Sequence, residues 1–177
     1  VDRAGCVDAR GREINRNRLI ALASAIVLEK HPGGTVVTDS VTSDGLKEFI
    51  EGTLGGKHRR FKRGYKNVIN EAIRLNREGI DAPLAIETSG HAALRDNYFL
   101  DDGAYLATRI LITVARLRAE GRTVEDLIGA LREPAEAEEI RFAITEPDFR
   151  AYGDTVLDGL GQYAEDKGWR VADDSYE

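Results

Sequence analysis

Polar and ionisable side chains follow one apolar segment of the chain within five positions. The segment Leu84–Ile86 is succeeded by Glu87, Thr88, Ser89, Gly90 and His91. Carboxylate and hydroxyl oxygens accept hydrogen bonds, hydroxyls also donate, and glycine lets a ligand approach the backbone closely. Histidine accepts or donates a proton near neutral pH. These residue types predict a site that hydrogen-bonds a ligand and exchanges a proton.

The segment is one of three polar clusters that stand at expected strand or helix ends. The stretches TDSVTSDG, FKRGYKN and ETSGH begin at Thr38, Phe61 and Glu87. Ligands of open α/β sheets usually bind where strands end and helices begin. All three clusters thus stand where a ligand could bind, and the strand that ends at Ile86 is expected to deliver its polar groups to the rim of the sheet.

The elements that must position these clusters alternate between strand and helix. Apolar residues at helical spacing between Leu19 and Val27 predict a helix that Asn15 or Asn17 could cap. Further helices are expected over about 43–53, 64–78, 102–119 and 151–167, with a short one starting at 123–126, and strands over 35–39, 83–87, 137–145 and 169–172. The segment 57–63 could be an exposed strand or a loop. This alternation predicts a three-layer α/β/α sandwich with a mixed sheet in a single domain.

Two details of the region after His91 bear on the site. The helix over 102–119 has apolar residues nearly all round, so we expect burial on more than one side. Asp101 and Asp102 precede it and are expected to cap its start.

Composition restricts the class of protein. The chain has 177 residues, 42% of them hydrophobic and 32% charged, with a net charge of -6. The negative charge argues against nucleic-acid and anionic-membrane partners, because phosphates attract basic surfaces. The single cysteine, Cys6, allows no internal disulfide and suits a reducing compartment, so we expect a cytoplasmic location. No apolar run approaches the ~20 residues of a membrane helix.

Three motifs in chain order resemble the α-D-phosphohexomutase family. ETSGH resembles its Gly-Glu-x-Ser-Gly-His sugar-binding loop, with Ile86 in place of the first glycine. FKRGYKNV is similar to a Val-Gly-Phe-Lys stretch and places Gly64, Tyr65 and Lys66 on it. Asp2 and Arg3 resemble the end of the family's Asp-x-Asp-x-Asp-Arg metal-binding loop, whose two earlier aspartates would precede this chain.

The resemblance implies domain organisation and activity. Residues 1–10 would end a preceding metal-binding domain, 11–170 would form domain III, and 171–177 would begin the linker to a C-terminal domain. The family moves a phosphoryl group between O1 and O6 of a hexose phosphate through a bisphosphorylated intermediate. A phosphoserine in another domain donates the group and Mg²⁺ polarises it. The partners would be the sugar phosphate and the other domains of the same chain.

The resemblance also implies roles for individual residues. Glu87, Thr88, Ser89 and Gly90 would bind the sugar, and Thr88 stands where relatives acting on glucosamine phosphate tend to carry glutamine, so glucose or mannose is favoured. His91, Lys66 and Arg3 would be catalytic, and Asp2 would be a metal ligand.

Each role has a plainer alternative. Glu87 could be a solvated loop carboxylate, Ser89 could cap a turn, His91 could be an orienting residue, and Lys66 could be an exposed solvated lysine.

Two functional hypotheses follow. The first is the sugar-recognition domain of a phosphoglucomutase or phosphomannomutase, with this chain inactive alone and without tight Mg²⁺ binding. The second is a non-catalytic α/β module that binds a sugar phosphate or a protein. Under the first, Glu87→Ala should reduce turnover with little effect on folding, because the loop is expected at the rim of the sheet.

Overall fold

The computed structural model describes residues 2–138 and 140–169, which fall into two compact units, Val1–Ala135 and Glu136–Glu177. The elements of the first unit are β1 (Cys6–Val7), β2 (Glu13–Ile14), α1 (Asn17–Leu28), β3 (Thr35–Asp39), α2 (Asp44–Glu48), a π-helical turn (Phe49–Thr53), β4 (Lys57–Phe61), α3 (Tyr65–Arg77), β5 (Leu84–Ile86), β6 (Ala92–Leu94), a 3₁₀ turn (Arg95–Asn97), α4 (Gly103–Ala119) and α5 (Glu125–Ile128). The second unit contains α6 (Phe149–Asp166).

The main sheet is mixed and has the strand order β4-β3-β5-β6. β3 runs parallel to both β4 and β5, with Val36 opposite Leu84. β6 returns antiparallel to β5, with Ile86 opposite Ala92. The carboxyl ends of β3, β4 and β5 therefore share one edge, because neighbouring parallel strands point the same way.

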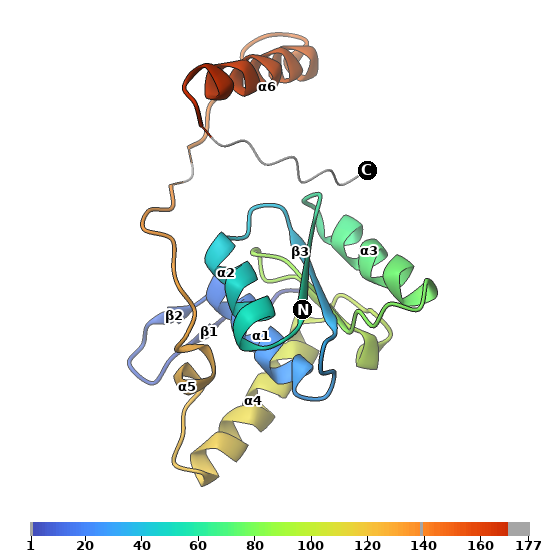
Figure 1. Ribbon diagram of the computed structural model, residues 1–177, viewed down its shortest axis with the longest axis vertical. Helices are drawn as coiled ribbons and strands as arrows, with labels where there is room; N and C mark the ends of the chain where they lie inside the picture. The colour runs from blue at the N-terminus through green and yellow to red at the C-terminus, as the bar shows by residue number, and fades with distance from the viewer. Residues whose placement is uncertain (1, 139, 170–177) are drawn as a thin grey trace. The chain divides into compact units, whose positions relative to one another are not determined.

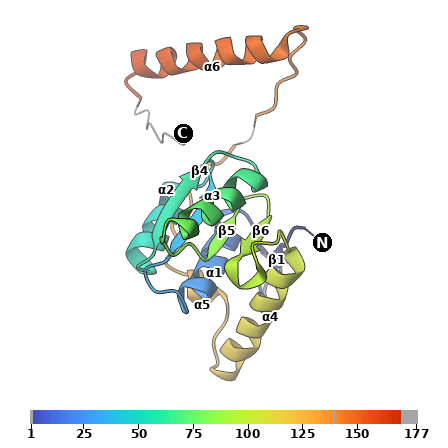
Figure 2. The same cartoon turned by 90° about the vertical axis from the view of Figure 1, so that its right-hand side faces the viewer.

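Alternate side chains of the strands enter two separate cores. Val36, Leu84 and Ile86 pack with α1, α4 and the π-helical turn. Val37 and Ala85 pack with α3 on the opposite face. Figure 1 shows β3 between α1 and α2 on one side and α3 on the other, and Figure 2 gives the view from the side. The expected α/β/α layering around a mixed sheet is confirmed.

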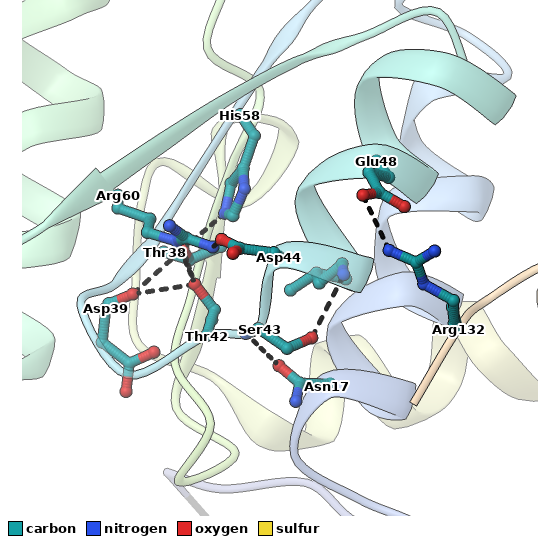
Figure 3. Close-up of polar contacts among 11 residues, drawn as sticks. Asn17, Thr38, Asp39, Thr42, Ser43, Asp44, Glu48, His58, Arg60 and Arg132 are labelled. Atoms are coloured by element: carbon teal, nitrogen blue, oxygen red, sulfur yellow. Dashed lines mark hydrogen bonds and ion pairs between the residues drawn. The ribbon is translucent and has the colours of Figure 1, made fainter. Parts of the chain in front are cut away.

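The first turn of α1 differs from expectation. The position before α1 is Arg16, with φ 51° and no side-chain hydrogen bond to the helix. Asn17 lies inside α1, and its Oδ1 accepts from the Ser43 N–H over 3.3 Å (Figure 3). Asn17 thus holds the loop after β3 instead of capping its own helix.

α4 is buried along one stripe, contrary to the expectation of burial on several sides. Leu106, Ile110 and Leu117 are buried at helical spacing, whereas Leu111 and Ile112 are 67% and 62% exposed. The core of the first unit reaches only the face of α4 that carries the buried residues. Among the described helices, none is long and apolar enough to cross a bilayer.

The second unit corrects one expected strand. The described residues of 137–145 form no strand, although Ile140, Phe142 and Ile144 alternate as strand residues do. All three are exposed, and the described part of this unit contains no strand with which they could pair. The expected helix over 151–167 is confirmed by α6. The expected strand 169–172 lies outside the described residues beyond Trp169. The assignment of residues 1–10, 11–170 and 171–177 to successive domains stays a prediction.

Candidate functional site

The three polar clusters, which the sequence places at strand–helix junctions, meet at the carboxyl edge of the sheet. Thr88, after β5, donates its hydroxyl to Asp39 Oδ2 at the end of β3 over 2.6 Å. Gly64, after β4, donates its N–H to Glu87 Oε1 over 2.7 Å. Two hydrogen bonds therefore tie the loop after β5 to the end of β3 and to the segment between β4 and α3.

The loop after β3 is held by a polar network that sequence reasoning missed. Thr38 Oγ1 lies 2.7 Å from His58 Nε2 and 3.3 Å from Thr42 Oγ1 (Figure 3). Arg60 donates from Nε to Thr42 Oγ1 and from a terminal nitrogen to Asp44, over 3.2 and 2.8 Å. The parallel register that places Thr38 opposite Arg60 brings these groups together. The network fixes the backbone that carries Asp39.

Glu87 is a buried carboxylate rather than a solvated loop residue. The residue is 6% exposed, and the Ser89 hydroxyl donates to Oε2 over 3.0 Å. Its other oxygen accepts from Gly64, the residue before α3, which has φ 121° and no capping side chain. Glu87 thus supplies from another strand the negative charge that stabilises a helix N-terminus. Glu87 lies at the rim of the sheet as expected, but its burial and its two hydrogen bonds indicate that its removal would also affect folding.

The turn between Glu87 and His91 is tight. Gly90 donates its N–H to the Glu87 carbonyl, and Glu87 donates to the His91 carbonyl, over 3.0 and 2.9 Å. Gly90 has φ 92°, and a Cβ there would lie 2.5 Å from the Ala4 carbonyl oxygen. Ala4 also donates its N–H to the Gly90 carbonyl over 3.0 Å. Glycine is therefore required where the N-terminal segment docks. Ser89, at the outer side of the turn, is exposed.

His91 is buried and contacted on both ring nitrogens. Nδ1 lies 2.7 Å from Asp101 Oδ2, and Arg3 Nε donates to Nε2 over 3.0 Å. The Tyr65 ring stacks on the imidazole, with 4.7 Å between centroids and 13° between planes. Asp101 was expected to cap α4, but Asp102 alone performs that role, its Oδ1 accepting from Tyr105 N–H over 3.0 Å. The structure thus brings Arg3, Tyr65 and Asp101 to His91.

Lys66 lies in the first turn of α3 and is exposed. Its amine lies 5.9 Å from the Tyr65 ring centroid. Lys66 therefore stands beside the His91 cluster through Tyr65.

The acidity of Asp39 is altered by its surroundings. Burial raises the pKa of its carboxyl above the ordinary value of 3.8, and the nearby Glu87 charge raises it further. The two hydrogen bonds from Thr88 oppose this rise. A charge on Asp39 is thus costly, because its carboxyl is removed from water.

Asp2, His91 and Asp101 bring potential metal-ligand atoms within 4.8 Å of one another. Mg²⁺ prefers an octahedron of oxygens. Here one ligand would be a ring nitrogen, and Asp101 Oδ2 is already bonded to that ring. The described residues therefore do not by themselves fit Mg²⁺.

Comparison with known proteins gives consistent results. Residues 15–134 match the family described as phosphoglucomutase/phosphomannomutase, alpha/beta/alpha domain III. The chain is 30% identical over 146 residues to a phosphomannomutase/phosphoglucomutase of Pseudomonas aeruginosa, covering 82% of this chain and 30% of that protein. It is 28% identical over 168 residues to a phosphoglucomutase of Neisseria meningitidis, covering 94% and 34%.

Among solved structures, a phosphoglucomutase/phosphomannomutase family protein of Burkholderia thailandensis superposes with a TM-score of 0.60 at 31% identity, over 75% of this chain and 27% of that one. A putative phosphomannomutase of Thermus thermophilus shares the fold, with a TM-score of 0.59 at 21% identity over 73% and 28%. The chain thus spans about a third of the length of the curated relatives it matches.

Proposed function

Because the chain belongs to the phosphoglucomutase/phosphomannomutase family, in which it corresponds to the alpha/beta/alpha domain III, we propose that it recognises the sugar of a hexose phosphate. The complete enzyme would interconvert hexose 1-phosphate and hexose 6-phosphate through a bisphosphorylated intermediate, with glucose or mannose as the sugar. It would be an isomerase of carbohydrate metabolism.

The arrangement of Glu87 and Ser89 is the observation that carries this proposal. Glu87 Oε1 accepts a hydrogen bond from the Gly64 N–H, and Oε2 accepts one from the Ser89 hydroxyl. Each carboxylate oxygen has a second lone pair that can accept another hydrogen bond. Vicinal sugar hydroxyls would donate to those lone pairs in charge-assisted bonds that contribute about 1.5–3 kcal/mol each. Ser89 is exposed and would donate to or accept from the same sugar when it turns over between half-reactions. Thr88 and Gly90 would shape the loop around it.

The neighbouring groups supply functions suited to phosphoryl transfer. His91 would exchange a proton with a sugar hydroxyl, Arg3 would stabilise charge on the phosphoryl group, and Lys66 would attract the substrate phosphate. Asp2 would contribute to a Mg²⁺ site only together with further aspartates, since alone it offers too few oxygens. Mg²⁺, when bound in the complete enzyme, would neutralise phosphoryl charge.

We propose further that the 177-residue chain does not catalyse the reaction alone. It spans about a third of the length of its curated relatives, and the phosphoserine donor that the family resemblance implies would belong to another domain. A site that recognises sugar without a phosphoryl donor would bind a substrate but would not convert it.

The test is an assay of the complete protein with glucose 1-phosphate and mannose 1-phosphate. Ser89→Ala should reduce kcat/KM by about tenfold, which corresponds to one lost hydrogen bond of about 1.4 kcal/mol. Thr108→Ala is the matched control, because its exposed hydroxyl donates to the Ala104 carbonyl within α4. Turnover unaffected by Ser89→Ala, or binding without turnover of either sugar by the wild type, would contradict the proposal.

A further inference from the structure

The two hydrogen bonds to His91 dictate the same protonation state of the ring. An ionised carboxylate only accepts, so Asp101 requires a proton on Nδ1. An arginine Nε–H only donates, so Arg3 requires a lone pair on Nε2. Both requirements are met by the neutral imidazole with its proton on Nδ1. A ring protonated on both nitrogens would point an N–H at the Arg3 N–H.

Both partners are anchored to the backbone around β6. His91 immediately precedes β6 and forms an antiparallel bridge with Arg3, and Asp101 forms one with Ala93. Asp102 donates its N–H to the Ala92 carbonyl over 3.1 Å. The Asp101 side chain is 16% exposed, and its Oδ1 is buried without a hydrogen-bond partner in the described part of the chain. The carboxylate is thus held by its backbone and directed to His91.

We propose that Asp101 is a positioning residue that fixes His91 in the Nδ1–H form, and that Arg3 and a substrate proton compete for Nε2. This rests on the proposed function of the site. A phosphoryl group, which guanidinium binds well, would draw Arg3 away and expose the Nε2 lone pair. The proton of a sugar hydroxyl would then pass to Nε2, leaving the O–H electron pair on the sugar oxygen. Phosphoryl binding and base activity would thereby be coupled.

The groups around the His91 ring restrict its orientation. One potential ligand atom of each of Asp2, His91 and Asp101 lies within 4.8 Å of the other two. Tyr65 covers one face of the ring by stacking. The stack and the bridge to Arg3 leave the imidazole little freedom to rotate. Because Arg3 is exposed, its side chain can move away, and we infer that Nε2 exchanges partners in this way.

The first experiment measures the tautomer by nitrogen NMR of the 177-residue chain with labelled histidine, at about pH 8.5, well above the ordinary histidine pKa of ~6.5. The wild type should show a protonated Nδ1 and an unprotonated Nε2. Asp101→Asn should give a mixture of tautomers, while the exposed control Asp96→Asn should match the wild type. An Nε2–H form in the wild type, or an unchanged tautomer in Asp101→Asn with folding intact, would overturn the proposal.

The second experiment tests the competition at Nε2. Diethylpyrocarbonate acylates an unprotonated imidazole nitrogen, and peptide mass analysis separates modification of His91 from that of His31 and His58. Arg3→Ala should raise the rate at His91 severalfold without changing the rates at the other two histidines. An equal rate at His91 in both proteins would show that Arg3 does not block Nε2.

The complete enzyme supplies the functional readout. Asp101→Asn should lower kcat by about 10²-fold, the scale of general acid–base catalysis, with little change in KM and in melting temperature. A proportional rise in KM with unchanged kcat would overturn the positioning role. If the wild type converted no hexose phosphate, the proposed function would fail, whereas the tautomer and acylation results would still decide the contacts of His91.

Discussion

Thr88 and Asp39 are separated by 49 positions and joined by a hydrogen bond of 2.6 Å from the threonine hydroxyl to the carboxylate. The Thr88 N–H donates to the other oxygen over 3.4 Å. These bonds fasten the candidate sugar loop to the end of β3. They also bring the carboxylate of Glu87, the residue before Thr88, close enough to affect the acidity of Asp39.

Asp39 should make stability fall as the pH rises. Its pKa is raised above 3.8 in the folded chain, chiefly by burial, so the folded state keeps its proton to a higher pH than the unfolded state does. Stability from this group is therefore present at low pH and lost between the unfolded and the folded pKa. Asp39→Asn should flatten that decline relative to wild type in unfolding experiments from pH 4 to 8. Asp96→Asn is the exposed control, and parallel curves for wild type and Asp39→Asn would contradict the prediction.

Glu87 should contribute to folding as well as to binding. Glu87→Ala removes the acceptor for the Gly64 N–H and for the Ser89 hydroxyl, which should lower the free energy of unfolding by about 1–3 kcal/mol. Glu87→Gln keeps one acceptor oxygen and should lose less. Denaturant titration of the 177-residue chain measures both. An unchanged midpoint for Glu87→Ala would mean that α3 does not depend on this cap.

Substitution of Gly90 should cost more stability than substitution of Gly121, because it adds a steric clash to the backbone strain that both share. Both have positive φ, 92° and 71°, but a Cβ at Gly90 meets the Ala4 carbonyl at 2.5 Å, whereas nothing lies within 4 Å of one at Gly121. Gly121→Ala should cost about 1–2 kcal/mol from the left-handed conformation alone. Gly90→Ala should cost more and should release the N-terminal segment, which amide hydrogen exchange at Ala4 would detect. Equal losses without faster exchange would refute the docking of that segment.

The comparison of sequence with structure shows which relationships a pattern can reveal. The clusters at Thr38, Phe61 and Glu87 were recognised in the sequence as lying at strand–helix junctions, where ligands of α/β sheets usually bind. That the three meet at one edge follows from the parallel pairing of β3 with β4 and β5, which only the structure shows. The contact between His91 and Asp101 was not predicted. It depends on the three-residue strand β6, which follows His91 and pairs with Asp101, and a strand this short gives no periodic signal. A spacing of ten residues across an apolar segment that pairs with β5 is the signal that could have suggested it.

Apolar periodicity also predicted more burial for α4 and for the described residues of 137–145 than the structure shows. The apolar residues of α4 predicted packing on several sides, yet Leu111 and Ile112 are exposed. Ile140, Phe142 and Ile144 alternate as strand residues do, yet all three are exposed. Hydrophobic pattern predicts which face could be buried, whereas burial requires a partner surface. The described part of each unit supplies no such surface to these residues.

Glu71 and Glu78 provide a matched pair of ion-pair tests on α3. The Glu71 side chain is 2% exposed and accepts from Arg59 and from Arg74, and Glu78 is 52% exposed and pairs with the same Arg74. Glu71→Gln should cost about 1–2 kcal/mol, allowing for the exposure of both arginines, and Glu78→Gln less than about 0.5 kcal/mol.

The hydrogen bonds from Arg74 hold the pKa of Glu71 below 4.5. The stability that ionised Glu71 contributes to the folded state is therefore fully present above the ordinary pKa of 4.5 and is lost as the pH falls through the lowered pKa. Unfolding measurements at pH 7 and pH 3 check both points, and an equal loss for the two variants at pH 7 would contradict them.

We expect that this chain does not bind Mg²⁺ with micromolar affinity. Asp2 is exposed, Asp101 Oδ2 is bonded to His91, and the third potential ligand is a ring nitrogen that Mg²⁺ disfavours. A titration of the 177-residue chain with MgCl₂, followed through the NMR signals of Asp2 and His91, should show only weak, unsaturated changes, and Asp2→Asn should behave as the wild type does. Saturation at micromolar Mg²⁺ that Asp2→Asn abolished would instead place a complete magnesium site within these residues, and would require Asp101 to leave His91.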